Sequence, residues 1–110
     1  MNITLTTHDD YAVVAVEGRL TATGAPRLRQ SVDDAVAAGR PRVVVDMAAV
    51  EFIDSSGIGA LIGGLKSARL AEGDLRIAAV PETVRRVLKL TNLDRVLREY
   101  PSAEAAFDVQ

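Results

Sequence analysis

The stretch that most limits how this chain can fold reads RVVVDM and spans residues 42–47. Three consecutive valines are typical of a strand that is buried on both faces. Helical patterns precede and follow this strand. Strands that alternate with helices indicate a largely parallel sheet whose crossover connections are right-handed. The stretch therefore predicts an α/β fold built around a central sheet.

Hydrophobic periodicity, glycine and proline place the other elements. Strands are expected over residues 2–7, 11–17, 74–80 and 95–98, with Gly18 ending the second strand and a loop over 48–52. Helices are expected over residues 25–38 with Gly39 as the C′ residue, over 55–70, from Pro81 onward, and from Ser102 through Phe107. The order is β-β-α-β-α-β-α-β-α. It describes one α/β domain over residues 1–110, with a mixed, mostly parallel sheet and about four helices.

Composition and charge exclude several classes of function. The chain has no cysteine and a single histidine, His8, so we expect no metal site and place His8 at the surface. The net charge is −2 with acids and bases mixed, which argues against direct nucleic-acid binding. The sequence has neither a long apolar span nor a secretory signal. We therefore expect a cytoplasmic protein that does not insert into membranes. A monomer is expected, with a weak dimer through a sheet edge or helix face as the alternative.

The stretch VEFIDSSGIGALIGG, residues 50–64, joins an acid and two hydroxyls to a glycine-rich segment. Gly57 and Gly59 begin a dinucleotide fingerprint, but Ile62 stands where the third glycine is needed, and the lysine–hydroxyl pair of a P-loop is missing. A nucleophile elbow requires glycine two residues before the serine, and Asp54 holds that position before Ser56. The stretch therefore indicates neither a cofactor site nor an enzyme.

A helix cap explains part of this stretch, because Asp54 or Ser55 can accept the free amide hydrogens of the first turn. At 100° per residue the buried side of the helix is expected to carry Ile58, Leu61, Ile62, Leu65 and Ala68. The opposite side is expected to carry Ser56, Gly59, Gly63, Lys66, Ser67 and Leu70, with Ser55 at its leading edge. Two glycines on an exposed helix face cost about 1 kcal/mol each relative to alanine. This favours a smooth surface on which another protein lies, with close packing inside the domain as the alternative.

The position of Ser55 is suited to phosphorylation. A phosphate there would add about −1.5 to −2 charges at the positive end of the helix dipole. Backbone amides at a helix start are natural partners of phosphate, so the fold should survive the modification. The neighbouring docking surface would change charge and shape, as a reversible binding switch requires.

The chain resembles the STAS domain family, and within it the free-standing bacterial anti-sigma factor antagonists. The resemblance rests on the stretches VAVEGRLTA, RVVVDMAAVEFIDSSGIGALIGG and GDLRIAAVPETVRRVLKLTNLDRVL. It implies that Ser55 is phosphorylated by an anti-sigma factor that is also a serine kinase. The unphosphorylated form would bind this kinase and release the sigma factor, and a serine phosphatase would reset the switch. Asp54, Ser56 and Gly57 would frame the site, and Asp46 would end the central strand.

One position departs from the family pattern, because Thr21 follows Gly18, Arg19 and Leu20 where an acid is common. The residues expected to contact the partner are Thr21, Asp54, Ser56, Gly57, Gly59, Gly63 and Lys66. The chief alternative is a non-switching STAS subunit of a membrane lipid transporter of the ABC type. A small hydrolase using Ser56 is a remote third class.

Overall fold

The central strand of the sheet is β3 (Arg42–Ile53), which contains the three valines. The computed structural model describes residues 1–107. Its five strands lie in the order β1 (Asn2–Thr7), β2 (Ala12–Leu20), β3, β4 (Asp74–Ala78) and β5 (Glu99–Tyr100). The pair β1–β2 is antiparallel and every other pair is parallel. The predicted mixed, mostly parallel α/β fold is confirmed.

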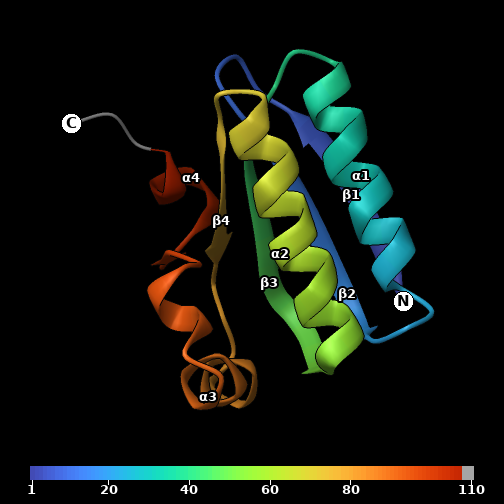
Figure 1. Cartoon of the computed structure of the whole chain (residues 1–110), viewed down its shortest axis with the longest axis vertical. Coiled ribbons are helices and arrows are strands. Elements are labelled where there is room, and N and C mark those ends of the chain that lie inside the picture. Colours follow the sequence, from blue (N-terminus) through green and yellow to red (C-terminus); the bar gives the residue numbers. More distant parts are fainter. Residues whose placement is uncertain (108–110) are drawn as a thin grey trace.

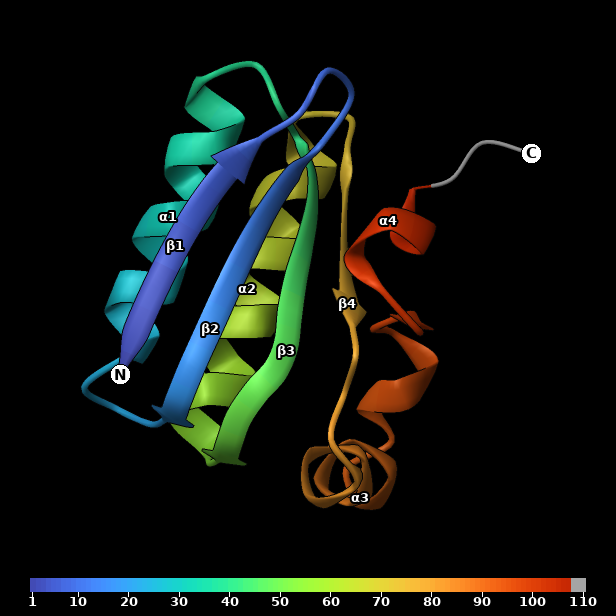
Figure 2. The ribbon, with the colours of Figure 1, turned by 180° about the vertical axis from the view of Figure 1, so that it is seen from behind.

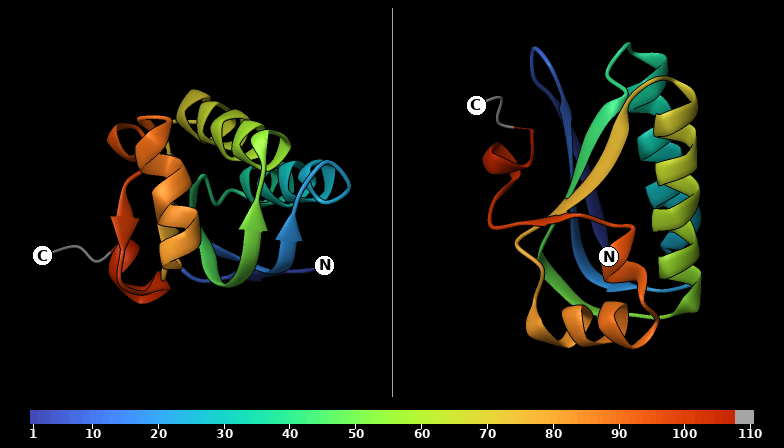
Figure 3. Two further views of the ribbon diagram at one scale, coloured as in Figure 1. Left: turned by 90° about the horizontal axis from the view of Figure 1, so that it is seen from below. Right: turned by 60° about the vertical axis from the view of Figure 1, so that its left-hand side comes forward.

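Four helices accompany the sheet: α1 (Ala25–Ala37), α2 (Ser55–Leu70), α3 (Glu82–Leu90) and α4 (Ala103–Ala106). The longest two, α1 and α2, lie side by side over one face of the sheet (Figure 1). The other face of β1 and β2 has no helix in front of it within residues 1–107 when the molecule is seen from behind (Figure 2). The side of α2 that faces away from the sheet has no other element over it within residues 1–107 (Figure 3, left).

The three valines of β3 are buried on both faces of the sheet, as predicted. Val43 and Val45 belong to the larger core, together with α1 and α2. Val44 points the other way and packs with Ala78, Ala106 and Phe107. Side chains of α4 thus cover the part of the second face that the helices α1 and α2 cannot reach.

The strands β2 and β3 extend further than predicted. Gly18 was expected to end β2 and residues 48–52 to form a loop, but both predictions are wrong. Glu17 pairs with Ala49 after one register shift, and Leu20 pairs with Ile53 after a second. Gly18 has φ +99°, a conformation that glycine adopts at low cost, and it allows the strand to bend there without ending. The extension carries both strands to the start of α2.

The prediction that the last strand spans residues 95–98 is wrong. A 3₁₀ turn, Leu93–Arg95, ends where that strand was expected to begin. The strand is β5, Glu99–Tyr100, which pairs with Ile77 and Ala78. The guanidinium of Arg85 ties α3 to this strand through hydrogen bonds to the Glu99 carboxylate, 3.0 Å from Nε to Oε1. The carboxylates of Glu99 and Glu82 raise the pKa of Arg85 above its usual value.

The end of α1 agrees with the prediction that Gly39 is the C′ residue. Gly39 has φ +82°, and its N–H donates to the carbonyl of Val36. The following N–H, from Arg40, donates to the carbonyl of Ala35 at 2.9 Å. This pair of bonds is the Schellman arrangement, and Pro41 prevents the helix from continuing.

Candidate functional site

The DSSG stretch lies where β3 passes into α2. The N–H of Asp54 donates to the carbonyl of Leu20 at 3.3 Å, which ties this point to the end of β2. The Asp54 side chain accepts a hydrogen bond from the N–H of Gly57 at 3.1 Å. Asp54 is therefore the N-cap of α2, and Ser55 is its first helical residue, exposed to solvent. Of the two capping candidates in the sequence, the structure selects Asp54 and leaves the hydroxyl of Ser55 free for chemistry.

Asp54→Ala is expected to lower the free energy of unfolding by about 1 kcal/mol, because the first turn of α2 loses its side-chain acceptor. Asp54→Asn is the matched control, since asparagine caps helices about as well as aspartate. Urea unfolding of both variants measures the difference. Equal loss of stability in the two variants would contradict a capping role and point to the charge instead.

Gly57 lies on the buried side of α2 and supports the site from beneath. A Cβ at this position would collide with the carbonyl oxygen of Leu20 and would lie 2.8 Å from Cγ1 of Ile53. Glycine is thus required for α2 to begin so close to β2 and β3. Gly57 was predicted to contact the partner. It is buried within the domain, so its own atoms offer the partner no surface.

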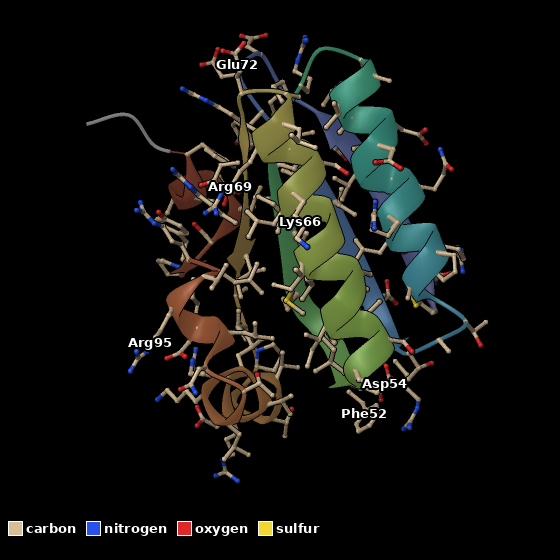
Figure 4. All side chains as sticks on the ribbon, in the orientation of Figure 1. Phe52, Asp54, Lys66, Arg69, Glu72 and Arg95 are labelled. Atoms are coloured by element: carbon tan, nitrogen blue, oxygen red, sulfur yellow. The ribbon has the colours of Figure 1, made fainter. Side chains whose placement is uncertain are left out.

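The outward side of α2 carries a row of residues that we call the α2 outer row: Ser55, Gly59, Ile62, Lys66 and Leu70. At 100° per residue these five fall within about a quarter of a turn of each other. Gly59 is exposed with open space around it, and Leu70 is 88% exposed. Figure 4 shows Lys66 on this side of the helix and Asp54 at its start. The outer row combines apolar and cationic groups beside the hydroxyl of Ser55.

Ile58 and Ile62, which were expected on the buried side, pack against the larger core but are only half-buried. The side chains that α2 buries belong to Leu61, Leu65, Ala60 and Ala68, and the backbone at Gly57 and Gly64 approaches the sheet and α1. The small residues on the inner side allow the helix backbone to approach the sheet and α1 closely. Both isoleucines then lie at the margins of the buried side.

The two glycines assigned to the exposed face behave differently. Gly59 is open, in accord with a docking surface. Gly63 is half-buried, because the side chain of Arg29 from α1 lies across it, so a Cβ there would collide with the guanidinium. Gly64 packs against Val32 and Leu75. Close packing inside the domain therefore explains Gly63 and Gly64, and only Gly59 keeps the docking interpretation.

The turn after β2 brings Thr21 close to the start of α2. Thr21 directly follows Leu20, whose carbonyl is bonded to Asp54, and its own carbonyl accepts the N–H of Ala25 at 2.8 Å. Ser56, the other predicted contact at this end, is half-buried. The structure thus gathers Thr21, Asp54, Ser55 and Ser56 at one end of the molecule. Gly59 lies one turn along the helix and Lys66 lies further away on the same side.

Sequence reasoning missed Phe52 and its contact with Arg19 at this end of the molecule. Phe52 is 42% exposed, and the guanidinium of Arg19 lies over its ring with Cζ 4.6 Å from the centroid. Figure 4 places Phe52 at the same end of the molecule as Asp54. Because residues 48–52 were taken as a loop, the pairing of Arg19 with Phe52 across β2 and β3 was not expected. An aromatic residue two positions before the DSSG stretch was the available signal.

Asp46 does not end the central strand and does not belong to this site. It lies in the middle of β3, where its Oδ1 accepts the N–H of Ala48 at 3.1 Å. Its neighbours Val45 and Met47 point into the larger core, so Asp46 faces the other side of the sheet. Among residues 1–107 no cluster of potential metal ligands occurs, and no helix is long and apolar enough to cross a membrane.

The fold and the site define a small α/β domain that presents a hydroxyl at the start of an exposed helix. Residues 2–106 match the family model described as STAS domain, and the chain belongs to that family. An anti-sigma-B factor antagonist from Staphylococcus epidermidis is 33% identical over 93 residues, which cover 84% of this chain and 86% of the relative.

Solved structures agree in fold and in name. A putative anti-sigma factor antagonist from Thermotoga maritima has a TM-score of 0.85 at 28% identity, covering 94% of this chain and 90% of the other. An anti-sigma factor antagonist from Mycobacterium paratuberculosis has a TM-score of 0.82 at 31% identity, covering 96% and 89%. The chain is thus similar along nearly its whole described length to proteins that carry this name.

Proposed function

We propose that this protein is an anti-sigma factor antagonist whose binding is switched at Ser55. Its unphosphorylated form binds an anti-sigma factor that is a serine kinase, and the sigma factor is thereby released. Phosphorylation of Ser55 by that kinase ends the binding, and a serine phosphatase restores it. The observation that carries the proposal is the exposed Ser55 at the first position of α2, with Asp54 rather than Ser55 serving as cap.

The geometry favours a switch that leaves the fold intact. A phosphate on Ser55 would lie at the positive end of the α2 dipole, where negative charge is stabilising. The capping bond from Gly57 goes to Asp54, so the modification removes no hydrogen bond in which the hydroxyl of Ser55 takes part. The added charge would fall within the α2 outer row, where a partner in contact with Gly59 and Ile62 would have to accommodate it.

The relatives support the same function. The Staphylococcus epidermidis protein and the two solved structures are named anti-sigma factor antagonists, and the first of them matches 84% of this chain. We propose a cytoplasmic binding module without catalytic machinery of its own. The kinase supplies the ATP site, and contacts centre on Thr21, Asp54, Ser56, Gly59 and Lys66.

Mass spectrometry tests the proposal. The chain is incubated with ATP and with each kinase-type anti-sigma factor encoded in the same genome, and peptides are then mapped. One phosphate on Ser55 is expected, and none is expected in the Ser55→Ala variant. No phosphate on the wild-type chain, with every kinase active on a control substrate, would contradict the switch and favour a passive adaptor such as a transporter subunit.

A further inference from the structure

Arg29 occupies an unusual place for an arginine. Its side chain leaves α1 and lies across Gly63 of α2, where the helix offers no Cβ to keep it away. Its Nε is buried and has no hydrogen-bond partner within residues 1–107. The one hydrogen bond of the guanidinium runs from Nη2 to the hydroxyl of Ser67, at 3.5 Å. A charged group is thus fixed on the surface of α2 with most of its donors unused.

Within the part of the chain that the structure describes, some arginines of other surfaces are paired with acids, whereas Arg29 is not. Arg69 and Arg76 both contact the carboxylate of Asp74, with Nε–O distances of 3.4 and 3.1 Å. Arg85 contacts Glu82 and Glu99. No carboxylate within residues 1–107 forms an ion pair with Arg29, and the same holds for Lys66. Among the described residues, the α2 outer row therefore contains one cation without a counter-charge, Lys66, and a second one, Arg29, lies beside it.

Arg29 and Lys66 border the same patch. Gly63 and Lys66 are three positions apart on α2, which makes them neighbours on the helix surface. Lys66 belongs to the outer row, and the guanidinium that covers Gly63 lies along the edge of that row. The helix itself carries no acidic residue between Ser55 and Leu70 that could neutralise them. A planar guanidinium held in place loses little freedom when it meets a carboxylate, and the pairing is bidentate in its favoured form.

We propose that Arg29 and Lys66 form the receptor for carboxylate side chains of the anti-sigma factor kinase. Gly63 is the residue that makes the receptor possible, because any side chain there would displace the guanidinium. The inference rests on the proposed function and names the partner chemistry of the same surface. It assigns to the kinase an acidic element that lies along α2 about two to three turns from Ser55.

Binding measurements on charge-removing variants test the receptor. The kinase used is the one that phosphorylates Ser55 of the wild-type chain, and its Kd is measured with nucleotide that cannot be hydrolysed. Arg29→Gln and Lys66→Gln together are expected to weaken binding at least tenfold, because carboxylates of the partner lose their counter-charges. Arg86→Gln is the matched control. That arginine is 75% exposed on α3, and its substitution should change Kd less than twofold.

The salt dependence and the stability separate a docking role from a structural one. Binding of the wild-type chain should weaken as salt rises, and the double variant should show a shallower dependence. The thermal midpoint of the double variant should stay within about 2 °C of the wild type, since Arg29 makes a single long hydrogen bond. A large fall in the midpoint with an unchanged Kd would assign Arg29 to the fold instead.

Zero-length crosslinking locates the partner groups directly. A carbodiimide joins a lysine amine to a carboxylate only when the two are in contact. A crosslink is expected from Lys66 to an aspartate or glutamate of the kinase. The Arg29→Lys variant keeps the positive charge and introduces a second amine, so it should give a further crosslink. It should bind more weakly than the wild type and more tightly than Arg29→Gln, because an ammonium cannot form the bidentate pair.

The outcomes distinguish the two proposals. If the wild-type chain binds none of the kinase-type anti-sigma factors, the proposed function falls and this inference falls with it. If the wild-type chain binds and the double variant binds equally well, or if no crosslink reaches an acidic residue, the carboxylate receptor is wrong while the switch at Ser55 stands.

Discussion

Ser55→Asp is expected to weaken binding to the anti-sigma factor kinase at least a hundredfold while leaving the protein folded. The substituted carboxylate would stand at the first position of α2, where the helix dipole favours negative charge by about 0.3–1 kcal/mol. The free energy of unfolding should therefore stay unchanged or rise slightly. In the complex, the same charge would be buried against the partner without a counter-ion, and an unpaired interfacial charge costs several kcal/mol. Calorimetric titration with the kinase measures the loss.

Two variants control this experiment. Ser55→Ala removes the acceptor hydroxyl without adding charge, and it should bind the kinase close to wild-type strength whether or not ATP is present. Lys89→Gln on α3 changes the net charge by the same amount as Ser55→Asp at an exposed position away from α2. It should bind normally. Full-strength binding by a folded Ser55→Asp variant would be incompatible with the proposed switch.

The fold was largely predictable because its strongest signals are local. The three valines of β3 specify a strand covered on both faces, and Gly39 followed by Pro41 specifies where α1 ends. The wrong predictions concern segments whose structure depends on pairing between β2 and β3 more than on the local sequence pattern. Residues 48–52 show no simple alternation of buried and exposed side chains, because register shifts accompany their pairing with β2. A glycine such as Gly18 marks either the end of a strand or a bulge, and only the partner strand decides between them.

The site was predictable to the extent that it lies on one helix. The capping residues, the exposed hydroxyl and the outward position of Lys66 follow from the sequence around Ser55 and from helical periodicity. Gly63 could not be assigned, because the group that covers it, Arg29, comes from another helix. The hydrogen bond from Arg29 to Ser67 spans 38 positions in the chain. Contacts of that separation leave no trace in local spacing, so the docking and packing interpretations of the glycines could not be separated.

Substitution of Gly57 and Gly59 by alanine is expected to have opposite effects on stability, although the two residues lie two positions apart on the same helix. At Gly57 a methyl group would collide with the carbonyl of Leu20, which is backbone and cannot turn aside. Such overpacking costs about 2 kcal/mol or more and should move the start of α2 away from β2. At Gly59 a methyl group meets nothing within 4 Å, so the helix gains about 0.5–1 kcal/mol from the better helix former.

Urea unfolding of the two variants measures both effects, with an unchanged slope expected for each. Because Gly57 fixes the position of the helix start, Gly57→Ala should also slow phosphorylation of Ser55 at temperatures where the protein remains folded. Gly59→Ala adds a single methyl group to the outer row and should be phosphorylated at close to the wild-type rate. Equal stabilisation of both variants would mean that a methyl group at position 57 meets no obstacle. The contact between the start of α2 and Leu20, and with it the role of Gly57 in positioning Ser55, would then be refuted. The two glycines therefore test whether phosphorylation of Ser55 depends on the close packing of α2 against the sheet, or only on the exposed residues of α2.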